Sequence, residues 1–306
     1  MKLNSDLTAN EAQGFEIYHF AREGMQGYNL QEKYREMGFI NVYKYYDHND
    51  VNEYAMQREM GKKGARFWVY GHFGFEVIKT DDGRRLERLT DDWQEQIEKQ
   101  VAALKEQGLW DYVLGFDFDE PMLHVSNDKF FKVSEYLSRY GKRQRAIFSS
   151  YEIFEGAHPR STDPEFGMEA HLIDKESCKY LTDIGWDEYW SLDYDVRKNA
   201  YDEMKRRIGR DDVYIWYVPC TWAFFGNRLG QEHCVKHLNL CYQMLCEEKN
   251  PGGLTCYNWY SFKNGGAEGE SLDWKFAEEN KSRWYTLENR MVEIGNEIIK
   301  KPLNRF

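Results

Sequence analysis

The segment Gly115-Phe-Asp-Phe-Asp-Glu-Pro121 gathers three carboxylates within four positions. In an extended chain alternate residues face the same side, so Asp117 and Asp119 share one face while the two phenylalanines share the other. Carboxylates on an inward face are costly to desolvate unless they have partners or a function. Carboxylates whose pKa values are pushed apart can supply an acid together with a base or nucleophile. The segment therefore predicts acid–base chemistry at the end of a strand.

The proline that closes this segment affects the residue before it. Pro121 disfavours the helical conformation at Glu120, so we expect Glu120 to be extended, with its carboxylate at the mouth of a site. The alternative interpretation is an Asp-Glu-Pro turn whose charges are only solvated. We assign the catalytic role to Asp117, Asp119 and Glu120 as a group.

Short β-rich runs alternate with amphipathic helical runs along the whole chain. The expected strands cover residues 14–21, 39–46, 66–73, 112–119, 145–151, 188–194, 213–219 and 253–259. The expected helices cover residues 30–37, 51–63, 91–107, 128–139, 175–182, 196–208, 231–248 and 277–299. This alternation predicts an α/β fold with a parallel sheet closed into a (β/α)8 TIM barrel, in which residues 1–306 form a single catalytic domain.

An open, doubly wound sheet is the rival architecture. It would normally present a glycine-rich phosphate turn after the first strand, and residues 21–30 match such a turn poorly. Two stretches interrupt the alternation: residues 75–89 contain Asp-Asp-Gly and predict a hairpin after strand three, and residues 154–172 predict a long loop after strand five. Both follow strands at the carboxyl end, where barrel enzymes place their active sites.

Composition restricts the class of partner. The net charge of −11 argues against nucleic acid, whose phosphates need a basic face. No stretch approaches 18 uninterrupted apolar residues, so we expect no membrane span. Residues 1–15 lack the apolar core of a signal peptide, which predicts a cytoplasmic protein, although a signal removed before Met1 stays open. The six cysteines form no Cys-x-x-Cys pair, which favours buried free thiols over a metal site.

The other expected strand ends carry residues that could contact a substrate. Strand seven ends without a carboxylate, and Asp195 near strand six would serve equally well as a helix cap. His72 beside Asp117 and Asp119 would suit a hydrolytic metal, but the spacing matches no metal motif, so we expect neither metal nor cofactor. The residues assigned to substrate binding are His72, Glu152, Asp193, Tyr217, Trp222, Tyr257 and Trp259.

GFDFDEP resembles the strand-four signature of glycoside hydrolase barrels, many of which carry Asn-Glu-Pro or Asp-Glu-Pro there. The resemblance implies that Glu120 is the acid/base. The adjacent pair also resembles the Asp-Glu pair of the family 20 and family 123 hexosaminidases, which implies that Asp119 orients a 2-acetamido nucleophile of the substrate. The segment is similar, more loosely, to the family 18 signature, but here Glu120 follows Asp119 without a spacer.

These resemblances imply a glycoside hydrolase with a carbohydrate substrate, specifically a β-N-acetylhexosaminide cleaved by substrate-assisted retention, with Trp259 as a sugar platform. Two alternatives stay open. One is a retaining double displacement in which Glu152 or Asp193 is the nucleophile. The other is a carbohydrate-binding barrel without catalysis. The sugar, the linkage, exo or endo action and the oligomeric state are not determined by the sequence.

Overall fold

A computed structural model of the chain describes residues 15–17, 42–45, 51–62, 66–70, 73–79, 85–155, 172–224, 230–257, 262–264, 267–271 and 281–300. The chain divides into two compact units. Unit 1 comprises Met1–Phe67, Tyr189–Leu192 and Ile215–Phe306, and unit 2 comprises Trp68–Glu188 and Asp193–Tyr214. The catalytic carboxylates expected from the sequence all lie in unit 2.

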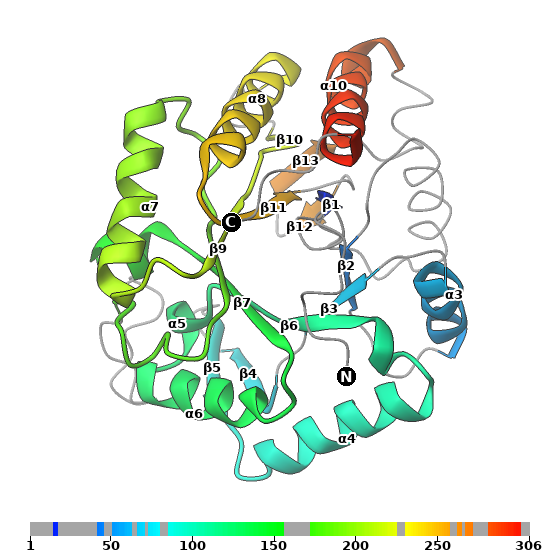
Figure 1. Cartoon of the computed structure of the whole chain (residues 1–306), viewed down its shortest axis with the longest axis vertical. Helices are drawn as coiled ribbons and strands as arrows, with labels where there is room; N and C mark the ends of the chain where they lie inside the picture. Colours follow the sequence, from blue (N-terminus) through cyan, green and yellow to red (C-terminus); the bar gives the residue numbers. More distant parts are fainter. Residues whose placement is uncertain are drawn as a thin grey trace. The chain divides into compact units, whose positions relative to one another are not determined.

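A parallel sheet forms the centre of unit 2. Strand β7 (Arg143–Phe148) lies between β6 (Val113–Asp119) and β8 (Asp183–Trp186) and is parallel to both. Figure 1 shows β6 and β7 side by side. On the other side of β6 lies β3 (Arg66–Tyr70), whose residues from Trp68 onward belong to this unit. Parallel neighbours need crossovers, and these contain helices α4 (Trp93–Glu106), α5 (Pro121–His124), α6 (Asn127–Ser138) and the π-helical turn η3 (Tyr151–Glu155). Helix α7 (Tyr194–Ile208) follows β8.

The two faces of β6 differ as its alternation predicts. Phe116 and Phe118 face the helices, where the Phe118 ring centroid lies 5.0 Å from that of Phe130 in α6 and 5.1 Å from that of Phe73. The opposite face carries Gly115, then the aspartates. A Cβ at Gly115 would lie 2.3 Å from the Arg143 carbonyl oxygen and 2.6 Å from the Trp68 ring, so no larger residue fits there. One face of the sheet is therefore apolar, and the other is charged and tightly packed.

Strands β4 (Phe75–Lys79) and β5 (Arg85–Leu89) form an antiparallel pair, which confirms the predicted hairpin after strand three. Thr90 closes its base, because the Thr90 backbone N–H and the Thr90 hydroxyl both donate to the Gly74 carbonyl, at 2.9 and 3.1 Å. The hairpin ends where α4 begins.

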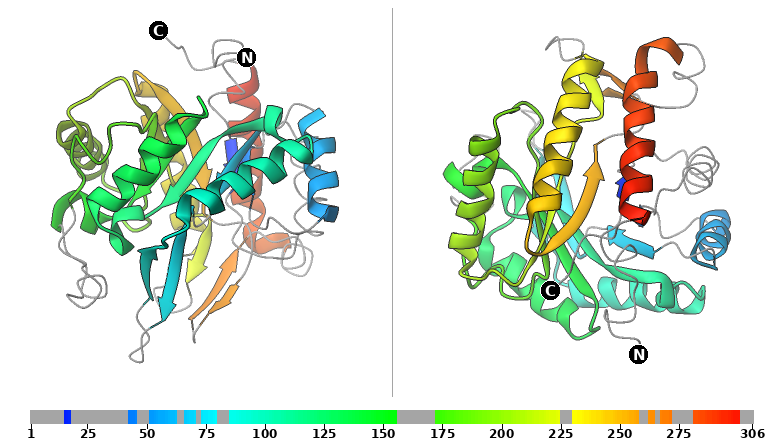
Figure 2. Two further views of the ribbon diagram at one scale, coloured as in Figure 1. Left: turned by 90° about the horizontal axis from the view of Figure 1, so that it is seen from below. Right: turned by 45° about the horizontal axis from the view of Figure 1, so that its top comes forward.

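Unit 1 has its own parallel strands. β11 (Pro251–Cys256) pairs with β1 (Phe15–Ile17) and with β9 (Tyr214–Tyr217). Helices α8 (Gln231–Glu247) and α10 (Lys281–Lys300) lie side by side, as Figure 2 shows. Their buried positions recur at helical spacing, as an amphipathic helix requires. The remaining elements are β2 (Val42–Tyr45), α3 (Val51–Lys62) and an antiparallel sheet in the order β10 (Trp222–Phe224), β13 (Ala267–Ser271), β12 (Phe262–Asn264).

Several expected elements were wrong. Strand six was expected at residues 188–194, but β8 ends at Trp186 and α7 begins at Tyr194. β8 is only four residues long and begins with the charged Asp183, so it lacks the longer apolar run that predicts a strand. The helix expected at 175–182 is a series of turns over 175–180. The expected helix at 30–37 and most of the loop at 154–172 lie outside the described residues.

The described strands and helices thus form a parallel α/β fold in which helices follow strands. Among the residues that the structure describes, no helix is long and apolar enough to cross a bilayer.

Candidate active site

Asp119 and Glu120 lie at the carboxyl end of β6. Asp119 is the last residue of the strand and pairs in register with Ile147 of β7. The backbone N–H of Glu120 donates to the Ile147 carbonyl at 2.8 Å, which extends the parallel ladder by one residue. Both acidic residues are partly exposed. The sheet therefore presents two adjacent carboxylates at its edge.

Glu120 has an unusual backbone conformation. Its φ of 45° and ψ of 50° are left-handed, and α5 begins at the next residue, so the expected extended conformation was wrong. The ladder bond holds the backbone N–H of Glu120 to β7, while Pro121 suits the first position of a helix. The chain must turn sharply between these two constraints. A non-glycine residue in this region costs on the order of 1–3 kcal/mol, and such strain concentrates at functional sites. The Glu120 side chain does not cap α5.

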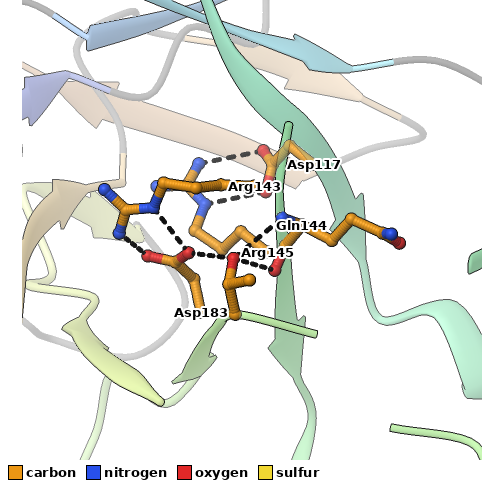
Figure 3. A network of polar contacts seen from close by, with 6 residues as sticks. Asp117, Arg143, Gln144, Arg145 and Asp183 are labelled. Atoms are coloured by element: carbon orange, nitrogen blue, oxygen red, sulfur yellow. Dashed lines mark hydrogen bonds and ion pairs between the residues drawn. The ribbon is translucent and has the colours of Figure 1, made fainter. Parts of the chain in front are cut away.

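Asp117 is fully buried and paired. Its two carboxylate oxygens accept from Nε and Nη2 of Arg145 at 2.8 and 2.9 Å (Figure 3). The Arg145 guanidinium lies 4.6 Å from the Trp68 ring centroid, where a cation–π contact adds to the pair. Asp117 thus faces a cation instead of solvent. The Arg145 guanidinium therefore balances the Asp117 charge inside the sheet, whereas Asp119 and Glu120 are partly exposed.

A second buried pair continues this network. The Arg143 guanidinium donates through Nε to Asp183 of β8 at 2.8 Å and also contacts the other carboxylate oxygen. The Gln144 side chain points to the opposite side of β7, where it bonds Ser134 of α6. Arg143, Arg145 and Asp183 were not among the site residues predicted from the sequence. Two arginines at alternate positions of a buried strand were a signal for buried carboxylate partners, but the spacing did not show that Arg145 pairs with Asp117 and Arg143 with Asp183.

Glu152 lies in η3 and is 1% exposed. One carboxylate oxygen accepts from the Met122 backbone N–H at 2.7 Å. The other accepts from the backbone N–H and the hydroxyl of Ser149, at 2.6 and 2.9 Å. Burial raises the pKa of Glu152 to about 7; the hydrogen bonds oppose this shift, and the nearby charge of Asp119 adds to it. The structure thus brings Glu152 near Asp119, as a buried group.

Of the remaining expected residues, Asp193 lies in unit 2, and Tyr217 and Tyr257 lie in unit 1. Asp193 is exposed and caps the N-terminus of α7: its side chain accepts from the backbone N–H groups of Asp195 and Val196. In unit 1, the Tyr217 hydroxyl donates to Glu248 beyond the end of α8, at 3.3 Å. Tyr257 stacks on Tyr189 with ring centroids 5.3 Å apart. The side chains of His72, Trp222 and Trp259 lie outside the described part.

Within the described ranges, no three His, Cys, Asp or Glu residues are arranged to hold a metal ion. The six cysteines are free thiols, but Cys246 is exposed, so the expectation that all are buried was wrong for that residue.

No protein-family model and no curated protein sequence matches the chain. Solved structures match it in fold. One is a GH113 β-1,4-mannanase, at 11% identity and a TM-score of 0.54, over 95% of this chain and 99% of the mannanase. Another is a GH30 endoxylanase from Clostridium papyrosolvens C71, at 12% identity and a TM-score of 0.51, over 95% of this chain and 72% of the endoxylanase.

A third is the β-glucuronidase of Ruminococcus gnavus, at 12% identity and a TM-score of 0.51, over 89% of this chain. The chain spans 49% of the length of that enzyme. At such identities the similarity concerns the fold, which is TIM-barrel-like. The resemblance to families 20, 123 and 18 is not tested by these structures and stays a prediction.

Proposed function

We propose that this protein is a glycoside hydrolase, built as one (β/α)8 barrel domain, that acts on a carbohydrate through Asp119 and Glu120. The observation that supports this is the strained turn after β6, which holds two partly exposed carboxylates at the carboxyl end of a parallel strand. Barrel enzymes place their catalytic groups at that end. The fold shared with a mannanase, an endoxylanase and a glucuronidase makes hydrolysis of a glycosidic bond the reaction to test.

In the proposed reaction Glu120 is the general acid. It donates a proton to the oxygen of the leaving group as the bond between that oxygen and the anomeric carbon breaks. The group that attacks the anomeric carbon has three candidates: the substrate's own acetamido group oriented by Asp119, Glu152, or Asp193. Both oxygens of Glu152 already accept hydrogen bonds, and Asp193 caps a helix. These contacts favour substrate assistance over a nucleophile from either residue, and a hexosaminide is the substrate that this route requires.

The test is hydrolysis of aryl β-glycosides, comprising mannoside, xyloside, glucuronide and N-acetylhexosaminide, together with mannan and xylan. We expect wild type to cleave at least one of them and Glu120→Gln to be slower by about 100-fold or more, because it cannot donate the proton. Glu106→Gln, at the exposed end of α4, is the matched control and should keep full activity. Equal turnover by Glu120→Gln and wild type would exclude the assignment. Saturable glycan binding without turnover would favour a binding barrel.

A further inference from the structure

Glu152 differs from the other buried carboxylates of unit 2. Asp117 is paired with Arg145, and Asp183 is paired with Arg143. Within the described ranges, Glu152 has no cationic partner, and its carboxylate accepts only from neutral donors of Met122 and Ser149. A buried carboxylate without a cation is costly, so it calls for a reason beyond packing.

The hydrogen bonds of Glu152 join three segments of the chain. Met122 is the second residue of α5, directly after the strained turn that carries Glu120. Ser149 directly follows β7, and the Glu152 carbonyl accepts from the Ile173 N–H at 2.9 Å, where the chain returns toward β8. The Glu152 side chain therefore connects Met122, in the turn after β6, with Ser149, at the end of β7. Glu152 itself is buried, and Asp119 lies close enough for its charge to add to the rise that burial causes in the pKa of Glu152.

We propose that Glu152 is a positioning residue: it holds the turn at Glu120–Pro121 against the end of β7 and thereby sets the placement of Asp119 and Glu120. This inference rests on the proposed function for its catalytic consequence. The physical reason for a glutamate is that three donors meet one side chain, and a carboxylate accepts at both oxygens. Glutamine has only one accepting oxygen, so its amide N–H2 would face either the Met122 N–H or the Ser149 N–H. Two other titratable groups lie near Glu152. Burial raises the pKa of Glu152 and the charge of Asp119 on β6 adds to that rise. Burial likewise raises the pKa of the Cys178 thiol, and Glu152 in turn adds to it.

Two measurements test the role of Glu152 in the full-length protein. The first is native-state exchange of the Met122 and Ser149 amide hydrogens, which needs no substrate. In Glu152→Gln we expect exchange about tenfold faster at the Met122 amide or the Ser149 amide, whichever loses its acceptor, with α4 amides unchanged. The second is kinetics on the substrate found above. We expect kcat to fall about 10- to 100-fold with KM within about twofold, since misplacement of catalytic groups acts mainly on the chemical step.

Glu155→Gln is the matched control, because Glu155 is exposed in the same turn. If Glu152→Gln is poorly folded, Ser149→Ala replaces it, since it removes one donor and leaves the backbone bonds in place. It should raise the apparent pKa of Glu152 in a carboxyl NMR titration and lower kcat more mildly. Unchanged amide exchange in Glu152→Gln would overturn the proposal. Faster exchange with unchanged kcat would limit Glu152 to stability and overturn its positioning role. If wild type cleaves no glycan, the proposed function fails while the exchange experiment still decides whether Glu152 holds the turn.

Discussion

At the scale of single residues, the acidic groups of unit 2 differ by environment more than by type. Asp117 is paired with Arg145, Glu152 is buried among neutral donors, and Asp119 and Glu120 are partly exposed at a strand end. Of these four groups, Asp119 and Glu120 are the ones accessible to a ligand. Glu120 also has a strained backbone at a position where glycine would be easier to accommodate. A glutamate at such a position points to a function for its side chain.

Replacement of Glu120 by glycine should stabilise the protein relative to replacement by alanine. Both variants remove the carboxylate, but only glycine adopts a φ of 45° without a steric cost. We expect the free energy of unfolding of Glu120→Gly to exceed that of Glu120→Ala by about 1 kcal/mol, with both variants inactive. Urea denaturation provides the measurement. Equal stabilities would mean that the backbone at this position is not strained.

The buried Glu152 should make stability depend on pH. Its pKa is raised from 4.5 to about 7 in the folded protein. Between these values the folded state binds more protons than the unfolded state, so the free energy of unfolding falls as pH rises. The fall attributable to Glu152 is at most roughly 3 kcal/mol and is complete above about pH 7. Urea denaturation from pH 4 to 8 should show this slope in wild type and a shallower one in Glu152→Gln; parallel curves would contradict the raised pKa.

At the scale of elements, the parallel strands β6, β7 and β8 are joined by charges as well as by backbone bonds. Asp117 lies opposite Arg145 in register, and Arg145 in turn lies opposite Asp183. Each aspartate nevertheless pairs with a different arginine, Asp117 with Arg145 and Asp183 with Arg143. Gly115 makes room for Arg143 at the base of this network. The network thereby specifies strand order and register, since a slip of one residue would separate every pair.

Asp117→Asn should be strongly destabilising, because it leaves the buried Arg145 cation without its partner. We expect a loss of about 3–5 kcal/mol in the free energy of unfolding. The double variant Asp117→Asn with Arg145→Met should lose less than the sum of the single variants, because it removes both charges. Thermal or urea denaturation of the four proteins measures the coupling. Additive losses would show that the pair contributes little beyond packing.

At the scale of the whole molecule, the net charge of −11 bears on substrate choice. Anionic glycans such as glucuronides approach a protein of like charge, and salt screens that repulsion over about 8–10 Å. If both a neutral and an anionic glycoside are cleaved, raising the ionic strength should increase kcat/KM for the anionic substrate about twofold or more and leave the neutral one nearly unchanged. A parallel response of the two substrates would show that local charges at the site outweigh the net charge.

The sequence by itself determined features that depend on neighbouring positions. Alternation placed Asp117 and Asp119 on the face opposite Phe116 and Phe118, and Asp-Asp-Gly between β-rich runs predicted the hairpin β4–β5. Most of the helices that the structure describes also begin and end within a few residues of their expected bounds, because helical periodicity is a local signal. The acidic motif was therefore located at a strand end without any coordinates.

Only the tertiary structure decided which carboxylates are available. The bond between Asp117 and Arg145 joins residues 28 positions apart, and the bond between Met122 and Glu152 joins residues 30 positions apart. The left-handed turn at Glu120 likewise depends on the Ile147 carbonyl of the neighbouring strand. A single sequence shows residue types and local spacing, whereas burial, partners and pKa depend on which distant segments pack together. For that reason the position of the candidate site was predictable, and the separate roles of its acidic residues were not.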